Sequence, residues 1–375
     1  MTEQFSLAEE IQKAMADAMK KRGRANLLIA GRTGVGKSTL VNAVFQGKLA
    51  TTGQGRPVTQ HTREITKSGV PLAIFDTRGL EMADFEATLQ ELAELVERRG
   101  KEADPSEHIH VAWVCIAEDS RRVEDAEVEL VSMLEARGVP VIAVVTKARA
   151  DQGFRATVQE LLPLARNVAR VRALAEEFDD GHTVAPMGLA ELVELTSEVI
   201  PEGQRNAFAA AQKADVEQKR RRAHTAVGLA ATTAAGIGAV PIPFADALAL
   251  IPVQVSMLAS ITAIFGVPLE QGLLATLIAG AATGSGATVA GRAIVGGLLK
   301  LIPGAGTVMG GVISAATAAA MTSAFGEAYI ATLALLFARR EGEPPTPAEI
   351  TETFKEQLAL KQRPGTDDGA SAAHA

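Results

Sequence analysis

The chain has 375 residues, of which 47% are hydrophobic but only 4% aromatic, so aliphatic side chains supply most of its apolar surface. This length suffices for two or three domains. The formal net charge of −7 argues against a protein that coats nucleic acid through bulk charge, and no nucleic-acid partner is expected. The single cysteine, Cys115, excludes a disulfide framework within the chain and favours a reducing compartment.

The first 24 residues are predicted to form an amphipathic helix. Its apolar positions recur every four residues, at Leu7, Ile11, Met15 and Met19. The segment is charged throughout and lacks a long apolar run, so it does not read as a secretory signal peptide. Packing of this helix on the next domain is favoured over binding to a membrane surface.

Residues 25–201 alternate short apolar runs with helical patterns. Strands are expected at 25–30, 71–75, 108–117, 139–146 and 182–187. Helices are expected at 37–45, 83–99, 121–138, 154–178 and 189–199. Such alternation is typical of the α/β class, with a mainly parallel sheet covered by helices on both faces.

A phosphate-binding loop is predicted where the first of these strands meets the first helix. Residues 31–38, GRTGVGKS, have the spacing Gly-x4-Gly-Lys-Ser, and the glycines allow successive N–H groups to point at phosphates. Lys37 can reach the β- and γ-phosphates, and the Ser38 hydroxyl can hold Mg²⁺. The residues predicted to bind the nucleotide here are Gly31, Arg32, Thr33, Gly34, Val35, Gly36, Lys37, Ser38 and Thr39.

Two later segments are predicted to contact the metal ion and the γ-phosphate. Asp76 ends an apolar strand in FDTRG, where its carboxylate can hold Mg²⁺ through water while the N–H of Gly79 meets the γ-phosphate. In the preceding loop Thr59 and Thr62 compete as the threonine that binds both, and Thr62 is preferred because HTREI leads directly into the next strand. The predicted metal ligands are Ser38, Thr62 and Asp76, and the predicted catalytic residues are Lys37, Thr62 and Gly79.

Four motifs in this part carry a resemblance to a known family: GRTGVGKSTLVNAVF, PVTQHTREI, DTRGLE and VVTKARAD. Together they resemble those of the translation-factor-like P-loop GTPases, especially the Era-like and immunity-related types. The resemblance covers about residues 25–200. It implies GTP and GDP as ligands, Mg²⁺ as cofactor, and a switch in which GTP orders the loops around Thr62 and Asp76 and hydrolysis to GDP releases them.

The sequence departs from that family at the base and at the attacking water. The resemblance places Thr146 and Lys147 beside guanine, but Arg149 stands where the family has the aspartate that reads the base, and a guanidinium has no acceptor. Asp151 is the alternative acceptor and is equally well interpreted as a solvated loop acid; the other base-side loop is expected near VAPMG, residues 184–188. Leu80 stands where a Ras-like enzyme carries a water-orienting glutamine, so slow intrinsic hydrolysis is expected.

Three further residues near the γ-phosphate are interpreted with their alternatives. Arg78 is favoured as a surface ion-pair residue, and the alternative is an arginine finger acting on a second copy in a nucleotide-driven homodimer. His61 could orient water, but a loop histidine is more often simply exposed. Gly34 stands where some relatives carry an asparagine that holds K⁺, so the resemblance does not predict activation by K⁺.

An apolar helical domain is predicted at 223–340, after a basic-ended connecting helix at 202–222. Its Asp, Glu, Lys and Arg residues up to Ala338 are Asp246, Glu270, Arg292, Lys300 and Glu327. The stretch from Ala239 to Gly266 resembles a C-terminal domain of unknown function found after bacterial GTPase domains, the YcjF-like family, which has been treated as membrane-associated. A final helix and a disordered tail are expected at 341–375, the helix opened by a capping box of Thr346 and Glu349.

Membrane contact through residues 223–340 is favoured by three features. Residues 247–269 and 301–326 are each uncharged and long enough to cross a bilayer. Basic residues flank the region at 219–222 and 339–340, and pairs of small residues at 280/284 and 306/310 allow close helix packing in lipid. The expected location is then the cytoplasmic face of the inner membrane. The competing interpretation is a soluble, cytoplasmic bundle of small-residue helices, with corners at prolines 241, 243, 252 and 303.

A weak internal repeat with an offset of 60 residues pairs Ile242-Pro243 with Ile302-Pro303 and Phe265-Gly266 with Phe325-Gly326. It predicts two related helical hairpins. Taken together, the sequence predicts a GTP-hydrolysing, Mg²⁺-dependent switch that controls a membrane-associating helical domain. The alternatives are a soluble nucleotide-dependent scaffold with slow turnover, a nucleotide-gated pore and a ribosome-assembly GTPase.

Overall fold

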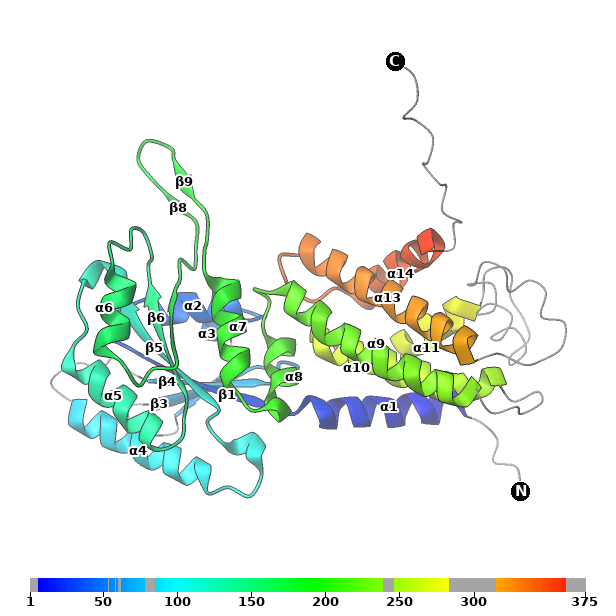
Figure 1. The fold of residues 1–375 in the computed structure, drawn as a ribbon, viewed down its shortest axis with the longest axis horizontal. Helices are drawn as coiled ribbons and strands as arrows, with labels where there is room; N and C mark the ends of the chain where they lie inside the picture. The colour runs from blue at the N-terminus through cyan, green and yellow to red at the C-terminus, as the bar shows by residue number, and fades with distance from the viewer. Residues whose placement is uncertain are drawn as a thin grey trace, which may run out of the picture.

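The computed structural model describes residues 6–52, 54–57, 59, 62–77, 85–238, 246–282 and 315–361. These residues form two parts that lie side by side, an α/β part at the left of Figure 1 and a body of helices at the right. The α/β part runs from β1 (Ala25–Ala30) to α7 (Leu189–Val199), and the helical body holds the first helix and the helices after α7.

A single sheet with the strand order β2-β3-β4-β1-β5-β6-β7 is the centre of the α/β part. The other strands are β2 (Gln54–Pro57), β3 (Thr62–Thr66), β4 (Leu72–Thr77), β5 (Val111–Ala117), β6 (Val141–Thr146) and β7 (Asn167–Arg170). β3 is antiparallel to β2 and β4, whereas β4, β1, β5, β6 and β7 are parallel neighbours. The predicted α/β class with a mainly parallel sheet is confirmed.

Helices cover both faces of this sheet, which is why β1, β5 and β6 are buried at every residue. Alternate residues of β1 enter two cores. Leu27 and Ile29 pack on the side of α2 (Lys37–Val44) and α7, whereas Leu28 packs on the side of α4 (Phe85–Gly100), α5 (Asp125–Ala136) and α6 (Phe154–Leu161). A short helix, α3 (Leu49–Thr52), and two 3-10 turns at 105–107 and 118–120 complete this part.

The helix predicted at 154–178 is wrong beyond Leu161. Pro163 lacks an N–H group and disfavours helical backbone at the preceding residue, so α6 ends there. The chain then forms the last strand of the sheet, β7, whose Val168 is buried beside β6. The strand predicted at 182–187 is reduced to β9 (Thr183–Val184), which pairs with β8 (Glu176–Glu177) in a hairpin outside the main sheet.

The first helix, α1 (Leu7–Arg22), does not pack on the α/β part that follows it in the chain, so that expectation is wrong. Ile11, Ala14 and Ala18 share a core with residues of α10 (Asp246–Phe265) and α11 (Gln271–Ala282). Figure 1 shows α1 running along the helical body, below α9 and α10. The amphipathic pattern therefore predicted the helix but not its partner.

The rest of the helical body consists of α8 (Glu202–Ala211), α9 (Val216–Gly238), α13 (Ala315–Arg339) and α14 (Pro347–Lys361). The single helix expected over 202–222 is two helices, because Asp215 caps a new one: its carboxylate accepts a hydrogen bond from the N–H of Gln218 at 2.8 Å. The predicted capping box of α14 is present, with the Thr346 N–H donating to Glu349 at 2.8 Å and the Glu349 N–H donating to the Thr346 hydroxyl. Pro252 lies inside α10 without ending it.

One helix of the described residues, α13, is long and apolar enough to cross a membrane, with a mean hydropathy of 1.4. Inside the protein, 67% of that stretch is buried, since α13 packs against α9, α10 and α14. The first predicted span, 247–269, is interrupted at Gly266, where α10 ends. The first half of the second span, the proline at 303 and the residues at 241–245, 284, 292, 306 and 310 lie outside the described residues.

The predicted repeat does not correspond to equivalent positions in the structure. Phe265 is the last residue of α10, and Gly266 after it adopts a φ of 75°, where an added Cβ would lie 2.1 Å from the carbonyl oxygen of Ala210. Phe325-Gly326, by contrast, lies in the middle of α13. The prediction of two related hairpins is therefore wrong at these residues.

Lys219 is also placed differently from the predicted basic flank. Its side chain is fully buried at the start of α9, where the amine donates to the carbonyls of Ala210 at 3.1 Å and Phe265 at 2.8 Å. Burial lowers the pKa of this amine well below its usual value. Lys219 thus joins helices to each other and presents no charge to a membrane surface.

Candidate nucleotide-binding site

The loop from Gly31 to Gly36 joins β1 to α2 and has the shape that its glycines allow. Gly31, Gly34 and Gly36 have φ values of 143°, 79° and 97°, a region that favours glycine. A Cβ on Gly31 would lie 2.4 Å from the carbonyl oxygen of Cys115 on β5. Gly36 is the N-cap of α2 and has no side chain to cover the first turn, so the N–H groups there are open to an anion.

Lys37 and Asp76 lie close to this loop. The Lys37 amine donates to the carbonyls of Gly31 at 2.6 Å and Arg32 at 3.2 Å, so it folds back over the loop. Asp76 is in β4, opposite Ile29 of β1, and its Oδ2 is 3.4 Å from the guanidinium of Arg63. Burial raises the pKa of the Asp76 carboxyl, while the charges of Lys37 and Arg63 oppose the rise.

The other carboxylate oxygen of Asp76, Oδ1, is buried and has no hydrogen-bond partner among the described residues. A buried oxygen without a donor is costly unless a ligand or water completes it. Ser38 is exposed on the first turn of α2, beyond Lys37. A carboxylate oxygen and a hydroxyl beside a phosphate-binding loop are the hard oxygen donors that Mg²⁺ prefers, so these residues fit the predicted metal ion.

Thr62 and Thr59 are placed differently from each other. Thr62 is the first residue of β3, is only 3% exposed and lies opposite Thr77 of β4. Thr59 is in the preceding loop and half-buried; its hydroxyl accepts a hydrogen bond from the Thr62 N–H at 3.0 Å. His61, Arg78, Gly79 and Leu80 lie outside the described residues, so the predictions made for them stay predictions.

The predicted base-side residues Thr146 and Lys147 follow β6. The buried Thr146 hydroxyl donates to the carbonyl of Val35 at 2.6 Å, which ties the end of β6 to the phosphate-binding loop. Lys147 has a φ of 54°, and its amine is 3.9 Å from Asp119. Thr146 therefore supports the loop and also lines the cavity beside it, and its predicted role in nucleotide binding stays a prediction.

Asp151 is committed to local structure. Its Oδ1 accepts a hydrogen bond from the Arg155 N–H at 2.8 Å, and its carbonyl accepts one from the Phe154 N–H at 2.9 Å, so it anchors the start of α6. The same Oδ1 is 3.6 Å from Arg170. One oxygen of the carboxylate that sequence reasoning offered for the base is thus engaged locally, and its predicted role toward the base stays a prediction.

A cavity of about 410 Å³ adjoins the phosphate-binding loop at this side of the sheet. Its lining includes Gly36, Thr39, Leu40, Asp119, Lys147, Arg149 and residues 171–176. Arg149 does not point at Asp151: its guanidinium forms a two-point ion pair with Glu176, including an Nε–Oε2 contact of 2.9 Å. Glu176 reaches this place because the β8-β9 hairpin continues from β7.

VAPMG, the expected second base-side loop, is not among the residues that line this cavity, and its role toward the base stays a prediction. Residues 171–176 line the cavity instead, and Met187 of VAPMG pairs with the backbone of Arg172 behind them. Gly188 is required there, since a Cβ would lie 1.9 Å from the carbonyl of Arg170. The missed signal is Pro163 followed by Val168 and Val171, which indicates a short strand rather than a helix.

Sequence reasoning also missed Glu118, which fixes the loop that carries Lys147 and Arg149. This carboxylate is 1% exposed and accepts hydrogen bonds from the N–H groups of Arg149 at 2.6 Å and Ala150 at 2.9 Å, and from Arg170 Nε at 2.8 Å. Burial by itself would raise the pKa of Glu118, but these donors outweigh it and hold the pKa below its usual value.

Two family models match separate stretches of the chain. Residues 26–147 match a family described as 50S ribosome-binding GTPase, and residues 204–361 match a domain of unknown function, DUF697. The second match supports the expectation of a C-terminal domain of unknown function, while its assignment to the YcjF-like family stays a prediction.

Curated relatives share parts of their length with this chain. It is 34% identical over 131 residues to GTPase Der of Rhizobium johnstonii, which is 34% of this chain and 26% of that protein. It is 32% identical over 163 residues to tRNA modification GTPase MnmE of an Acidovorax species, covering 41% of this chain and 33% of the relative. Magnetosome membrane protein 22 of Magnetospirillum gryphiswaldense is 34% identical over 91 residues, 24% of this chain and 47% of that protein. The chain spans about a quarter of the length of the Der protein it matches.

Solved structures of GTP-binding proteins are similar to about half of the chain. A probable GTP-binding protein engB has a TM-score of 0.33 and 21% identity, covering 47% of this chain and 98% of its own. Era of Aquifex aeolicus, bound to GDP and AlF4−, has a TM-score of 0.32 and 18% identity, covering 48% and 58%. With the family match and the mainly parallel sheet, the first part of the chain has the P-loop GTPase fold, and the helical region that follows it matches a domain of unknown function.

Proposed function

We propose that the chain binds GTP with Mg²⁺, hydrolyses it to GDP and passes the change to its helical body. The observation that carries the nucleotide part is the partnerless, buried Oδ1 of Asp76 beside the glycine loop and Lys37. The N–H groups of that loop would hold the β- and γ-phosphates, Lys37 would leave its carbonyl partners to meet them, and Mg²⁺ would neutralise their charge.

The metal ion would be held by the Ser38 hydroxyl and, through water, by Asp76. Of the two competing threonines we propose Thr59 as the third ligand, since it already lies in the loop. Thr62 would have to leave β3 and its place opposite Thr77. Gly79, the predicted γ-phosphate contact, keeps that role as a proposal.

Replacing Asp76 by asparagine tests the metal part. We expect Mg²⁺ to lower the dissociation constant of GTP for the natural chain. In the variant this Mg²⁺-dependent lowering should be about tenfold smaller, since an amide is a weaker partner for the ion and its water than a carboxylate. Binding of a fluorescent GTP analogue with and without Mg²⁺ measures this. Arg63→Gln, which removes only the exposed partner of Asp76 Oδ2, is the matched control. Equal Mg²⁺ dependence in the Asp76 variant and the natural chain would contradict the assignment.

For the base we propose Glu176 in place of Asp151. Glu176 lines the cavity beside the phosphate-binding loop and is held by Arg149, which occupies the position of the family's aspartate. Each of its oxygens keeps a second lone pair for the ring N–H and the exocyclic amine of guanine. The oxygens of Glu118 are taken by backbone N–H groups and Arg170.

The far end of α2 provides the route to the helical body. Gln46, two residues after α2, is buried, and its side-chain amide donates to the carbonyls of Ala210 at 2.9 Å and Phe265 at 3.4 Å. Glu343, between α13 and α14, accepts hydrogen bonds from the Gly47 N–H at 3.2 Å and from the amine of Lys213 at 3.0 Å. The short helix α2 would therefore have the phosphates at its first turn, while two helices of the body, α8 and α10, are contacted just after its last turn.

Gln46→Ala tests this route. We expect nucleotide affinity to stay within about twofold, because Gln46 is at the opposite end of α2, and stability to fall by about 2 kcal/mol, because buried carbonyls lose a donor. Hydrogen exchange of α8 and α10 should differ between the GDP and GTP-analogue states of the natural chain, and this difference should shrink in the variant. If the hydrogen-exchange rates of α8 and α10 in the natural chain are the same in the GDP and GTP-analogue states, the route is excluded.

The helical body is proposed as the effector part, at a membrane. The membrane role and the location at the inner membrane stay predictions supported by the apolar helix α13 and by the partial similarity to a magnetosome membrane protein. The homodimer stays a prediction as well, since Arg78 lies outside the described residues. The ribosome-assembly alternative has no support beyond the family description that matches residues 26–147.

A further inference from the structure

Arg22, the last residue of α1, is a buried cation without an acidic partner among the described residues. It is 8% exposed, and its Nε has no hydrogen-bond partner there. Burial lowers the pKa of its guanidinium. Burying an unpaired charge costs free energy, so a nearby anion would be strongly favoured.

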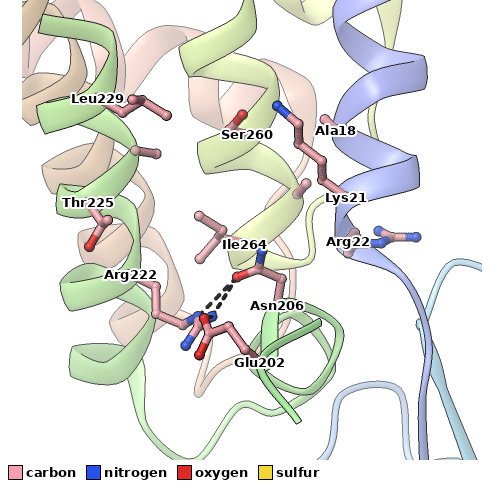
Figure 2. Close-up of a pocket in the computed structure, with 12 residues that line it drawn as sticks. Ala18, Lys21, Arg22, Glu202, Asn206, Arg222, Thr225, Leu229, Ser260 and Ile264 are labelled. Carbon is pink, nitrogen blue, oxygen red and sulfur yellow. Dashed lines mark hydrogen bonds and ion pairs between the residues drawn. The ribbon is translucent and has the colours of Figure 1, made fainter. Parts of the chain in front are cut away.

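A cavity of about 320 Å³ begins at this residue, between α1, α8, α9 and α10. Figure 2 shows Lys21 extending from α1 toward Ser260 of α10, while Arg222 of α9 is joined to Asn206 of α8. Arg222 donates to the Asn206 side-chain oxygen at 2.9 Å and also meets Glu202, which is shared with Arg205. The lining of the cavity therefore holds three cations, Lys21, Arg22 and Arg222, and one carboxylate, Glu202.

The opposite wall of the cavity is apolar and leads into a second cavity of about 330 Å³. The two share Lys21, Ala226, Leu229 and Ser260. The second is lined further by the apolar residues Ala14, Ala230, Pro252, Val253 and Met257, by the hydroxyl-bearing Thr233 and Ser256, and by Glu10, Lys13 and Asp17 at its α1 side. Leu229 is 70% exposed, which is unusual for a leucine on a helix that packs on three others. Together the two cavities form a groove with a cationic end and an apolar wall.

We propose that this groove binds an anionic phospholipid, with the phosphate at Arg22, Lys21 and Arg222 and an acyl chain along Ala226 and Leu229. Charge complementarity selects the headgroup, since an anion there gives the Arg22 guanidinium a charged partner. The apolar wall selects a lipid over a free phosphate, which would leave Leu229 exposed. A groove of this size is in the range of ordinary ligand sites, about 300–1,000 Å³.

Such a site would hold the chain on an anionic leaflet without any helix crossing it. It uses α1 and α9 in their packed positions, whereas a crossing by α13 would require the helical body to open, because that helix is mostly buried in it. The inference does not depend on the nucleotide, because none of the lining residues belongs to the phosphate-binding loop.

The test uses the full chain and a soluble probe, palmitoyl lysophosphatidic acid, below its micelle concentration. We expect the probe to bind and to raise the melting temperature, and Arg22→Gln to weaken binding about tenfold, as expected for the loss of a charged hydrogen-bonding group. Without probe, Arg22→Gln should be at least as stable as the natural chain, since it removes an unpaired buried charge. Arg221→Gln, an exposed cation of α9 that is not part of the groove, is the matched control and should bind the probe normally.

Three further arms decide the chemistry of the ligand. Palmitoyl lysophosphatidylcholine, with the same chain and a zwitterionic head, should bind about tenfold more weakly, and Leu229→Ser should weaken the anionic probe by severalfold. Inorganic phosphate should not displace it. Equal binding by Arg22→Gln, displacement by phosphate or indifference to Leu229→Ser would each overturn the proposal. GDP binding, measured in every variant, should be unchanged, so failure of the lipid site is separable from failure of the nucleotide site.

Discussion

Glu176→Gln is expected to shift the preference of the chain from GDP toward xanthosine diphosphate by about 100-fold. Guanine presents a ring N–H and an amine to the carboxylate, and hydrogen bonds to a charged group are worth about 1.5–3 kcal/mol each. A glutamine keeps one acceptor but turns an amide N–H₂ toward the guanine amine. Xanthine carries an oxygen at that place, which accepts from the new amide. The ratio of the two dissociation constants measures the effect.

Two variants make this result specific to Glu176. Asp151→Asn should leave the ratio unchanged, because its carboxylate anchors α6. Asp119→Asn should also leave it nearly unchanged, because that side chain is 64% exposed to water. The fold should tolerate Glu176→Gln, since the lost ion pair with the mostly exposed Arg149 is of the surface kind, worth about 0–1 kcal/mol. The assignment to Glu176 would be contradicted if the Asp151 variant shifted its preference toward xanthosine diphosphate. An unchanged ratio of the two dissociation constants in the Glu176 variant would contradict it as well.

Gly31→Ala is expected to destabilise the α/β part by about 3 kcal/mol and to abolish measurable nucleotide binding. Its φ of 143° is strained for any residue with a Cβ, and the new methyl group would lie 2.4 Å from the Cys115 carbonyl. That oxygen belongs to the buried strand β5 and has no room to retreat. The loop must therefore move away from the sheet, taking its N–H groups out of position.

Gly34→Ala separates backbone strain from collision. Gly34 also has a positive φ, 79°, but nothing lies within 4 Å of its added Cβ, so a loss of only about 1 kcal/mol is expected. Urea unfolding followed by the fluorescence of Trp113 measures both variants, because this single tryptophan is fully buried in β5. Equal losses in the two variants would show that contact with Cys115 is unimportant.

The sequence was sufficient for the α/β class and for the phosphate-binding loop, because both follow from local rules. The spacing of Gly31, Gly36 and Lys37 predicts a conformation that needs no distant partner, and the structure has glycine φ values there to match. The apolar runs of β1, β5 and β6 are long and unbroken, as buried parallel strands require.

The base side could not be predicted in the same way, because it depends on which distant segments meet. Asp151 was the obvious acid in the sequence, but one of its carboxylate oxygens anchors α6, whereas Glu176, one of the three acids that line the cavity, belongs to a hairpin after β7. The strand β7 was itself hidden, since its residues also fit a helical pattern and only Pro163 argued otherwise. Lys219 likewise belongs to a basic run in the sequence. Its neighbours in the chain gave no sign that its amine would be buried and donate hydrogen bonds to two distant carbonyl groups.

The position of α1 has a consequence for how the chain is made. Its apolar face, with Ile11 and Ala14, packs mainly on α10 and α11 and less on α8, so most of its partners are absent until residues 246–282 have been synthesised. The α/β part, complete by α7, can fold in the meantime, as domains generally do during synthesis. Docking of α1 is therefore expected among the last steps of folding during synthesis, after the α/β part.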